Sequence, residues 1–168
     1  MRIVVVAVLM AALAVPSVSG AQTVIENFDQ LPEHTIAYGS PLALEHFRVE
    51  IPSPGRDASI RPANAHDELA SGMVMGIPDG QSLSTVFFYF KQPWRRMDIT
   101  FVMPPSDEPV HSVAMLYGET EHPHGMTVQH SRAGHRVRVS MSPSTAPSFT
   151  SLVLHLQRGA YVDNVELR

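Results

Sequence analysis

The chain has 168 residues, of which 44% are hydrophobic and 17% are charged, and it contains no cysteine. This length is typical of a single domain, and the apolar content argues against wholesale disorder. The lack of cysteine excludes disulfides, thiolate metal sites and cysteine nucleophiles, while the net charge of −4 argues against nucleic acid or an anionic membrane as the main partner.

Residues 1–21 have the pattern of a secretory signal peptide. Arg2 makes the start positive, Ile3–Val15 is an uninterrupted apolar run, and small residues up to Ala21 offer a cleavage site. The apolar run is shorter than the roughly 20 residues that span a bilayer as a helix. We therefore expect a cleaved leader, a single domain over 22–168, no membrane anchor after cleavage, and a secreted or periplasmic location; an uncleaved anchor is the alternative.

Most of the remaining chain alternates apolar and polar residues with a period of two, which is typical of half-buried strands. Clusters of Pro, Gly, Asp and Ser separate the alternating segments, as in Pro78–Gly80. Short strands punctuated in this way indicate an all-β sandwich or barrel. The predicted strands are Thr23–Phe28, Leu42–Ile51, Gly72–Ile77, Leu83–Phe90, Arg96–Met103, Val110–Tyr117, Gly125–His130, His135–Met141, Phe149–Gln157 and Ala160–Leu167.

One predicted strand departs from the alternation. The segment Val86–Phe90 is apolar at both parities. We therefore expect a central strand that is covered on both sides, or a strand whose second face meets a ligand or a partner.

Three short segments carry a resemblance to a known family. The opening strand and turn, Val24–Pro32, resembles an "FDDLP" motif, and the closing Tyr161–Leu167 is similar to an "IDNV" strand. Between them, Val86–Phe90 followed by Gln92-Pro93 resembles an "F-x-x-P" central strand. These motifs resemble those of galactose-binding-like domains of secreted bacterial proteins, the fold of many carbohydrate-binding modules. The resemblance implies a single antiparallel β-sandwich of jelly-roll type and a carbohydrate as the ligand, although fold analogy alone does not transfer function.

Acidic residues near both chain ends suggest a cation site. Regular alternation places Glu26 and Asp163 on otherwise apolar strand faces, where a carboxylate must be paired, hydrogen-bonded, protonated or bound to a cation. The resemblance implies a structural Ca²⁺ held by Glu26, Asp163 and Asp29. The alternative is that Asp163 closes a local turn and Glu26 lies at a strand edge.

Aromatic residues near strand ends are candidates to stack on a sugar. Trp94 and Tyr117 are the predicted ligand-binding rings, and Tyr38 or Tyr89 can supply another. The alternative for a lone tryptophan in a small domain is a place in the core or at its rim.

Arg136 and Arg138 project from one face of a predicted strand. Their guanidinium groups can bind a carboxylate or sulfate of an acidic glycan through paired hydrogen bonds. The alternative is a solvated outer face that discourages edge pairing.

The sequence contains no recognised catalytic constellation. A Gly-x-Ser-x-Gly pentapeptide and a Gly-rich phosphate loop are absent, and no pair of carboxylates stands out. We therefore expect no enzymatic activity. The predicted function is that of an exported, non-catalytic binding module whose partner is a carbohydrate, another cell-envelope ligand or another exported protein. A structural or protein-interaction sandwich without a small ligand is the alternative, followed by a small hydrolase.

Overall fold

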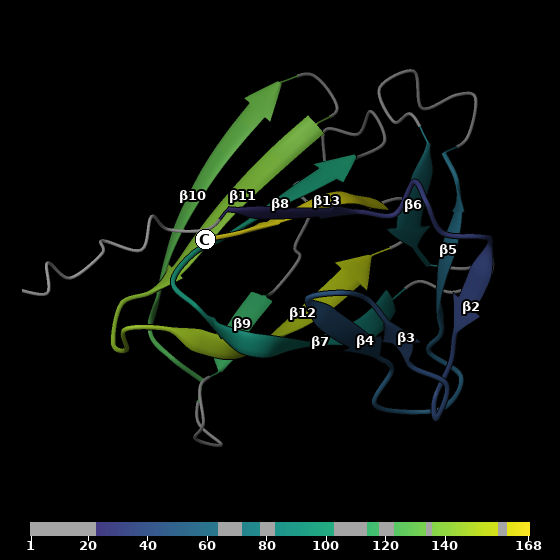
Figure 1. The fold of residues 1–168 in the computed structure, drawn as a ribbon, viewed down its shortest axis with the longest axis horizontal. Helices are drawn as coiled ribbons and strands as arrows, with labels where there is room; N and C mark the ends of the chain where they lie inside the picture. Colours follow the sequence, from purple (N-terminus) through teal and green to yellow (C-terminus); the bar gives the residue numbers. More distant parts are fainter. Residues whose placement is uncertain are drawn as a thin grey trace, which may run out of the picture.

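Figure 1 shows the protein, as a computed structural model, built from two antiparallel β-sheets that face each other. The structure describes residues 23–63, 72–77, 83–102, 114–117, 123–133, 136–157 and 161–168, and the predicted leader lies outside them. Within these ranges every regular element is a strand, and no helix has the length and apolarity needed to cross a membrane. The predicted fold class, an all-β antiparallel sandwich, is confirmed.

The larger sheet has eight strands. They are β1 (Val24–Asn27), β2 (His34–Ile36), β5 (Ala58–Pro62), β6 (Met73–Gly76), β8 (Met97–Val102), β10 (Met126–Ala133), β11 (Arg136–Pro143) and β13 (Tyr161–Leu167). Across the sheet the order is β10-β11-β8-β13-β6-β5-β2, with β1 paired to β13.

The smaller sheet has five strands. They are β3 (Leu42–Ala43), β4 (Phe47–Glu50), β7 (Leu83–Trp94), β9 (Ala114–Tyr117) and β12 (Phe149–Gln157). The order is β3-β4-β7-β12-β9, so β7 is the central strand, as its two-sided apolar pattern predicted.

The two ends of the described chain are neighbours in the larger sheet. Strand β1 runs antiparallel to β13, with Val24 opposite Leu167 and Glu26 opposite Val165. This pairing places the first and last described strands side by side (Figure 1).

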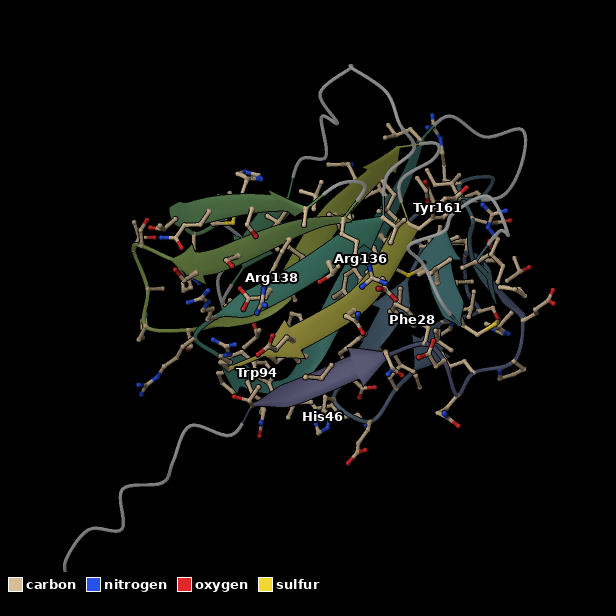
Figure 2. The ribbon with its side chains drawn as sticks, turned by 90° about the horizontal axis from the view of Figure 1, so that it is seen from above. Phe28, His46, Trp94, Arg136, Arg138 and Tyr161 are labelled. Atoms are coloured by element: carbon tan, nitrogen blue, oxygen red, sulfur yellow. The ribbon has the colours of Figure 1, made fainter. Side chains whose placement is uncertain are left out.

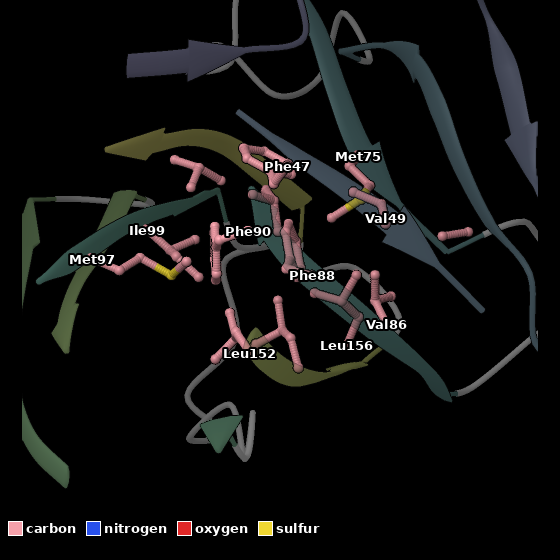
Figure 3. Packing of buried hydrophobic residues seen from close by; sticks show 14 of the residues in the cluster. Phe47, Val49, Met75, Val86, Phe88, Phe90, Met97, Ile99, Leu152 and Leu156 are labelled. Atoms are coloured by element: carbon pink, nitrogen blue, oxygen red, sulfur yellow. The ribbon is translucent and has the colours of Figure 1, made fainter. Parts of the chain in front are cut away.

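The core fills the space between the sheets (Figure 3). Alternation along β7 turns Val86, Phe88 and Phe90 inward, where Phe88 packs on Phe47 with ring centroids 5.5 Å apart. On the opposite side of the core, the larger sheet contributes Met75, Met97 and Ile99. Each large apolar side chain that is fully buried stabilises the fold by about 1.5–3 kcal/mol, so the alternating faces suffice for a core without disulfides.

Several strand boundaries differ from the prediction. The segment predicted as one strand, Leu42–Ile51, is a hairpin of β3 and β4, whose turn is closed by the Leu44 amide donating to the Phe47 carbonyl at 2.8 Å. Strand β7 continues beyond Phe90 to Trp94, and the short strands β2 and β5 were not predicted. Short strands escape a period-two search because three to five residues hold too few alternations to stand out.

Candidate functional site

Of the two aromatic residues predicted to stack on a ligand, the structure describes the side chain of Trp94 but not that of Tyr117. Trp94, the last residue of β7, is 4% exposed and belongs to the core, with the His46 ring edge-on at 6.4 Å. It presents no open ring face, which agrees with the core alternative. Tyr117 ends β9 opposite Ser151, but its side chain lies outside what the structure describes.

The predicted ligand-binding Arg138 belongs to an ion-pair network on the outer face of the larger sheet (Figure 2). Its Nη2 atom lies 2.6 Å from both the Asp98 and the Glu166 carboxylates. Arg96 donates to Asp98 at 3.2 Å, and Arg168 contacts Glu166. These side chains come from β11, β8 and β13, which are neighbours in the sheet, from the turn before β8, and from Arg168 directly after β13.

Asp98 is the buried centre of this network, with 2% of its surface exposed. Burial alone would raise the pKa of this carboxyl group. Hydrogen bonds from Ser140, Arg138 and Arg96 outweigh that effect and hold the pKa below its ordinary value. Arg138 therefore compensates a buried negative charge in this structure, which is a different role from binding an external anion.

Arg136, the second predicted arginine, contacts Asp163. Its Nη1 atom lies 3.2 Å from the carboxylate; the Asp163 side chain is buried, whereas the Arg136 side chain is about two-fifths exposed. The register of β13 against β8 shifts between Val162 and Asn164, and Asp163 is the extra residue of this irregularity. The shift explains why Val162, at the opposite parity from Val165, is also buried.

The three carboxylates predicted to hold calcium have separate partners. Burial raises the pKa of Asp163, Arg136 lowers it, and the nearby charge of Asp29 raises it. Asp29 also accepts the Met73 amide at 2.9 Å, and Glu26 accepts the His46 amide at 3.2 Å.

The positions of these carboxylates bear on the predicted cation site. Glu26, on β1, binds the turn between β3 and β4 and so links the two sheets, whereas Asp29 and Asp163 interact electrostatically with each other. Among the described residues no group of three or more His, Cys, Asp or Glu side chains converges as metal ligands do. The calcium ion itself stays a prediction.

An open groove of about 390 Å³ lies beside the smaller sheet, at the end of β4. Tyr38, Phe87 and Tyr89 supply aromatic rings to its wall, and Glu50 supplies a carboxylate. Phe87 and Tyr89 pack edge to face, with ring centroids 6.0 Å apart. They occupy the parity of β7 opposite to the core, so the two-sided apolar pattern of this strand is explained by the core on one face and the groove on the other.

A tight turn positions Tyr38 at the rim of the groove. The Ser40 amide donates to the Ala37 carbonyl at 3.0 Å, and Gly39 has a φ of 76°, a conformation that glycine adopts without strain. A bridge between Tyr38 and Ile51 fastens the turn to the segment after β4. The Tyr38 residue is thereby held with 61% of its surface exposed.

Strand pairing brings charged groups next to the aromatic rings. In the register of β4 with β7, Arg48 is opposite Tyr89 and Glu50 is opposite Phe87. The guanidinium carbon of Arg48 lies 4.7 Å from the centroid of the Tyr89 ring, and its Nε atom lies 2.8 Å from Glu50 Oε1. Burial and the Glu50 charge raise the pKa of Tyr89, although Arg48 lowers it, so the phenol stays protonated at neutral pH.

Sequence reasoning identified part of this groove. Tyr38 and Tyr89 were named as possible additional rings, and the apolar residues at both parities of Val86–Phe90 predicted either a strand covered on both sides or a face that meets a ligand or a partner. Glu50 was missed because its place beside the rings depends on the pairing of β4 with β7. No family model, curated protein or solved structure matches this chain, so a functional argument rests on the groove and its chemistry.

Proposed function

We propose that the protein is exported and binds a glycan, without catalysis, in the groove lined by Tyr38, Phe87, Tyr89 and Glu50. The leader pattern in residues 1–21 supports export. The observation that carries the binding function is the open aromatic groove with a carboxylate in its wall.

The dimensions and chemistry of the groove suit a short saccharide. Its volume of about 390 Å³ falls in the range of roughly 300–1,000 Å³ that is typical of small-molecule sites. Tyrosine rings offer flat apolar faces for the C–H face of a pyranose, and their hydroxyl groups offer hydrogen bonds. The Glu50 carboxylate accepts hydrogen bonds from sugar hydroxyl groups.

We also propose that the sandwich is related to the galactose-binding-like jelly-roll domains. The pairing of β1 with β13 puts the two segments that resemble galactose-binding-like domains next to each other. This arrangement supports a jelly-roll relationship, and with it a carbohydrate as the ligand.

Binding without turnover fits the residues of the groove. Glycoside hydrolysis usually requires two carboxyl groups on opposite sides of the scissile bond. Glu50 is the one carboxylate among the described residues that line the groove. This observation supports a binding module over a small hydrolase.

The test compares tyrosine variants on the two sheets by calorimetry, with a ligand chosen from a glycan array. We expect Tyr89→Ala to weaken binding by about two- to tenfold, because stacking contacts of this kind contribute roughly 0.5–1.5 kcal/mol. Tyr161→Ala is the matched control, since Tyr161 on β13 also carries an arginine, Arg61, at 4.7 Å from its ring centroid. An array without any binding glycan, or equal affinities for the two variants, would contradict the proposal.

A protein-interaction module is the second candidate, and the exposure of Tyr38 is the observation that favours it. An exposed aromatic residue beside two partly buried rings also suits the binding of a partner protein. Self-association in solution that disappears in Tyr38→Ala, together with an empty glycan array, would support this candidate over the first.

A further inference from the structure

Resting on the proposed function, we propose that the groove selects amino sugars whose amino group is free and protonated. Glu50 would bind the ammonium group while Tyr38 and Tyr89 contact the sugar ring. Two observations support this selectivity: the charged residues around the groove, and the contacts that the Arg48 guanidinium makes with Glu50 and Tyr89.

The described residues that line the groove offer an acidic group and no basic one. Glu50 is the ionisable carboxylate among its described lining residues, which include no lysine, arginine or histidine. The chain as a whole has a net charge of −4. A cationic glycan therefore finds an ion-pair partner in Glu50, whereas an anionic glycan finds no basic side chain among these lining residues.

Arg48 shows how a cation fits these groups. Its guanidinium contacts the Glu50 carboxylate and lies over the Tyr89 ring. A positive charge therefore finds both an ion-pair partner and an aromatic face here, the combination that recognises ammonium ligands in other proteins. A ligand ammonium would use the same two kinds of contact from the groove.

The Arg48 pair leaves Glu50 able to bind a ligand. The Arg48 Nε atom contacts one oxygen of Glu50, and a carboxylate has two oxygens with several acceptor positions. The side chains of Arg48 and Glu50 are 55% and 34% exposed. An exposed ion pair of this kind is weak. A ligand ammonium group can therefore share the Glu50 carboxylate with Arg48, or displace Arg48 from it, at a small cost in free energy.

The experiment compares three oligosaccharides of equal length: glucosamine, N-acetylglucosamine and glucose oligomers. Binding is measured by calorimetry at about pH 6, where glutamate is ionised. We expect the glucosamine oligomer to bind about tenfold more tightly than the acetylated one. Glu50→Gln should remove this preference while keeping the weaker binding of the neutral sugars.

Glu45→Gln is the matched control, because it removes the same charge from a side chain that is 84% exposed in the neighbouring hairpin turn. It should retain the preference for the free amine. A preference that survives Glu50→Gln, or that is lost equally in Glu45→Gln, would overturn the inference and assign the effect to the overall charge.

The outcomes separate the inference from the function on which it rests. Equal affinity for the three oligomers, with binding still weakened by Tyr89→Ala, overturns the amino-sugar selectivity and leaves glycan binding standing. No binding of any glycan, here or on the array, overturns both.

Discussion

Replacing Arg138 with methionine tests whether the network around Asp98 stabilises the fold. Methionine keeps much of the aliphatic packing of the arginine stem and removes its charge. The change leaves a carboxylate that is 2% exposed without its 2.6 Å partner, although Arg96 still donates to it.

The expected loss follows from the burial of the two partners. Breaking a fully buried ion pair costs about 3–5 kcal/mol. Here the Arg138 side chain is 42% exposed, so solvent screens the interaction and we expect about 2–3 kcal/mol. For a domain of this size, such a loss lowers the Tm by about 4–12 °C.

Urea denaturation at neutral pH measures the loss, and Arg48→Met is the matched control. Arg48 also contacts a strand carboxylate, at 2.8 Å, but with its side chain 55% exposed, so its removal should cost less than about 1 kcal/mol.

Acid conditions provide a second check. The pKa of Asp98 is lowered in the folded state, so its stabilising contribution is present above the unfolded pKa of about 4 and is lost as the pH falls through the folded value. The difference between wild type and Arg138→Met should shrink over that range. Equal losses for the two arginine variants, or a loss that does not change in acid, would refute the reasoning.

Three further changes probe other parts of the fold. Gly76→Ala should destabilise the protein by about 1–3 kcal/mol in urea, because a Cβ atom there would lie 2.5 Å from Tyr161 Cδ1; an unchanged midpoint would mean that the ring moves aside freely. Phe88→Ala removes a fully buried ring and should cost about 3–5 kcal/mol in the same assay, with a loss below 1 kcal/mol contradicting its place in the core. The pKa of Asp163 is raised in the folded state, so its ionisation lowers the stability of the fold as the pH rises from about 4. Arg136→Gln should make the Tm fall more steeply over this range, because it removes the charge that opposes the rise in pKa. EDTA should leave the Tm of the wild type unchanged if Arg136 is the counter-ion, whereas a drop that Ca²⁺ reverses would establish the predicted calcium site.

The large features of the fold were predictable because they depend on local alternation. The central position of β7 followed from its apolar residues at both parities. The hairpin of β3 and β4 left a usable signal, since the apolar parity changes between Leu44 and Phe47. Reading that change as a turn would have divided the predicted strand correctly.

The candidate site was less predictable because its residues meet only through strand pairing. The role of Arg138 depends on carboxylates in two other strands. The order of β11, β8 and β13 in the sheet cannot be predicted from local sequence patterns. The irregularity at Asp163 likewise changes the parity of β13 without a sequence signal such as glycine or proline. Trp94 is buried because β7 continues past Pro93, where the pattern suggested an exposed loop.

The pairing of the first strand with the last has a consequence for biosynthesis. A ribosome releases residues 24–27 long before residues 161–167, yet these segments are hydrogen-bonded neighbours in the finished sheet. Strand β13 also pairs with β8 and β6, so the larger sheet cannot be completed before residues 161–167 have been synthesised. Contacts between residues so distant in the chain form slowly. The larger sheet therefore remains incomplete until β13 emerges from the ribosome, and deletion of residues 161–167 would leave β1 without its partner.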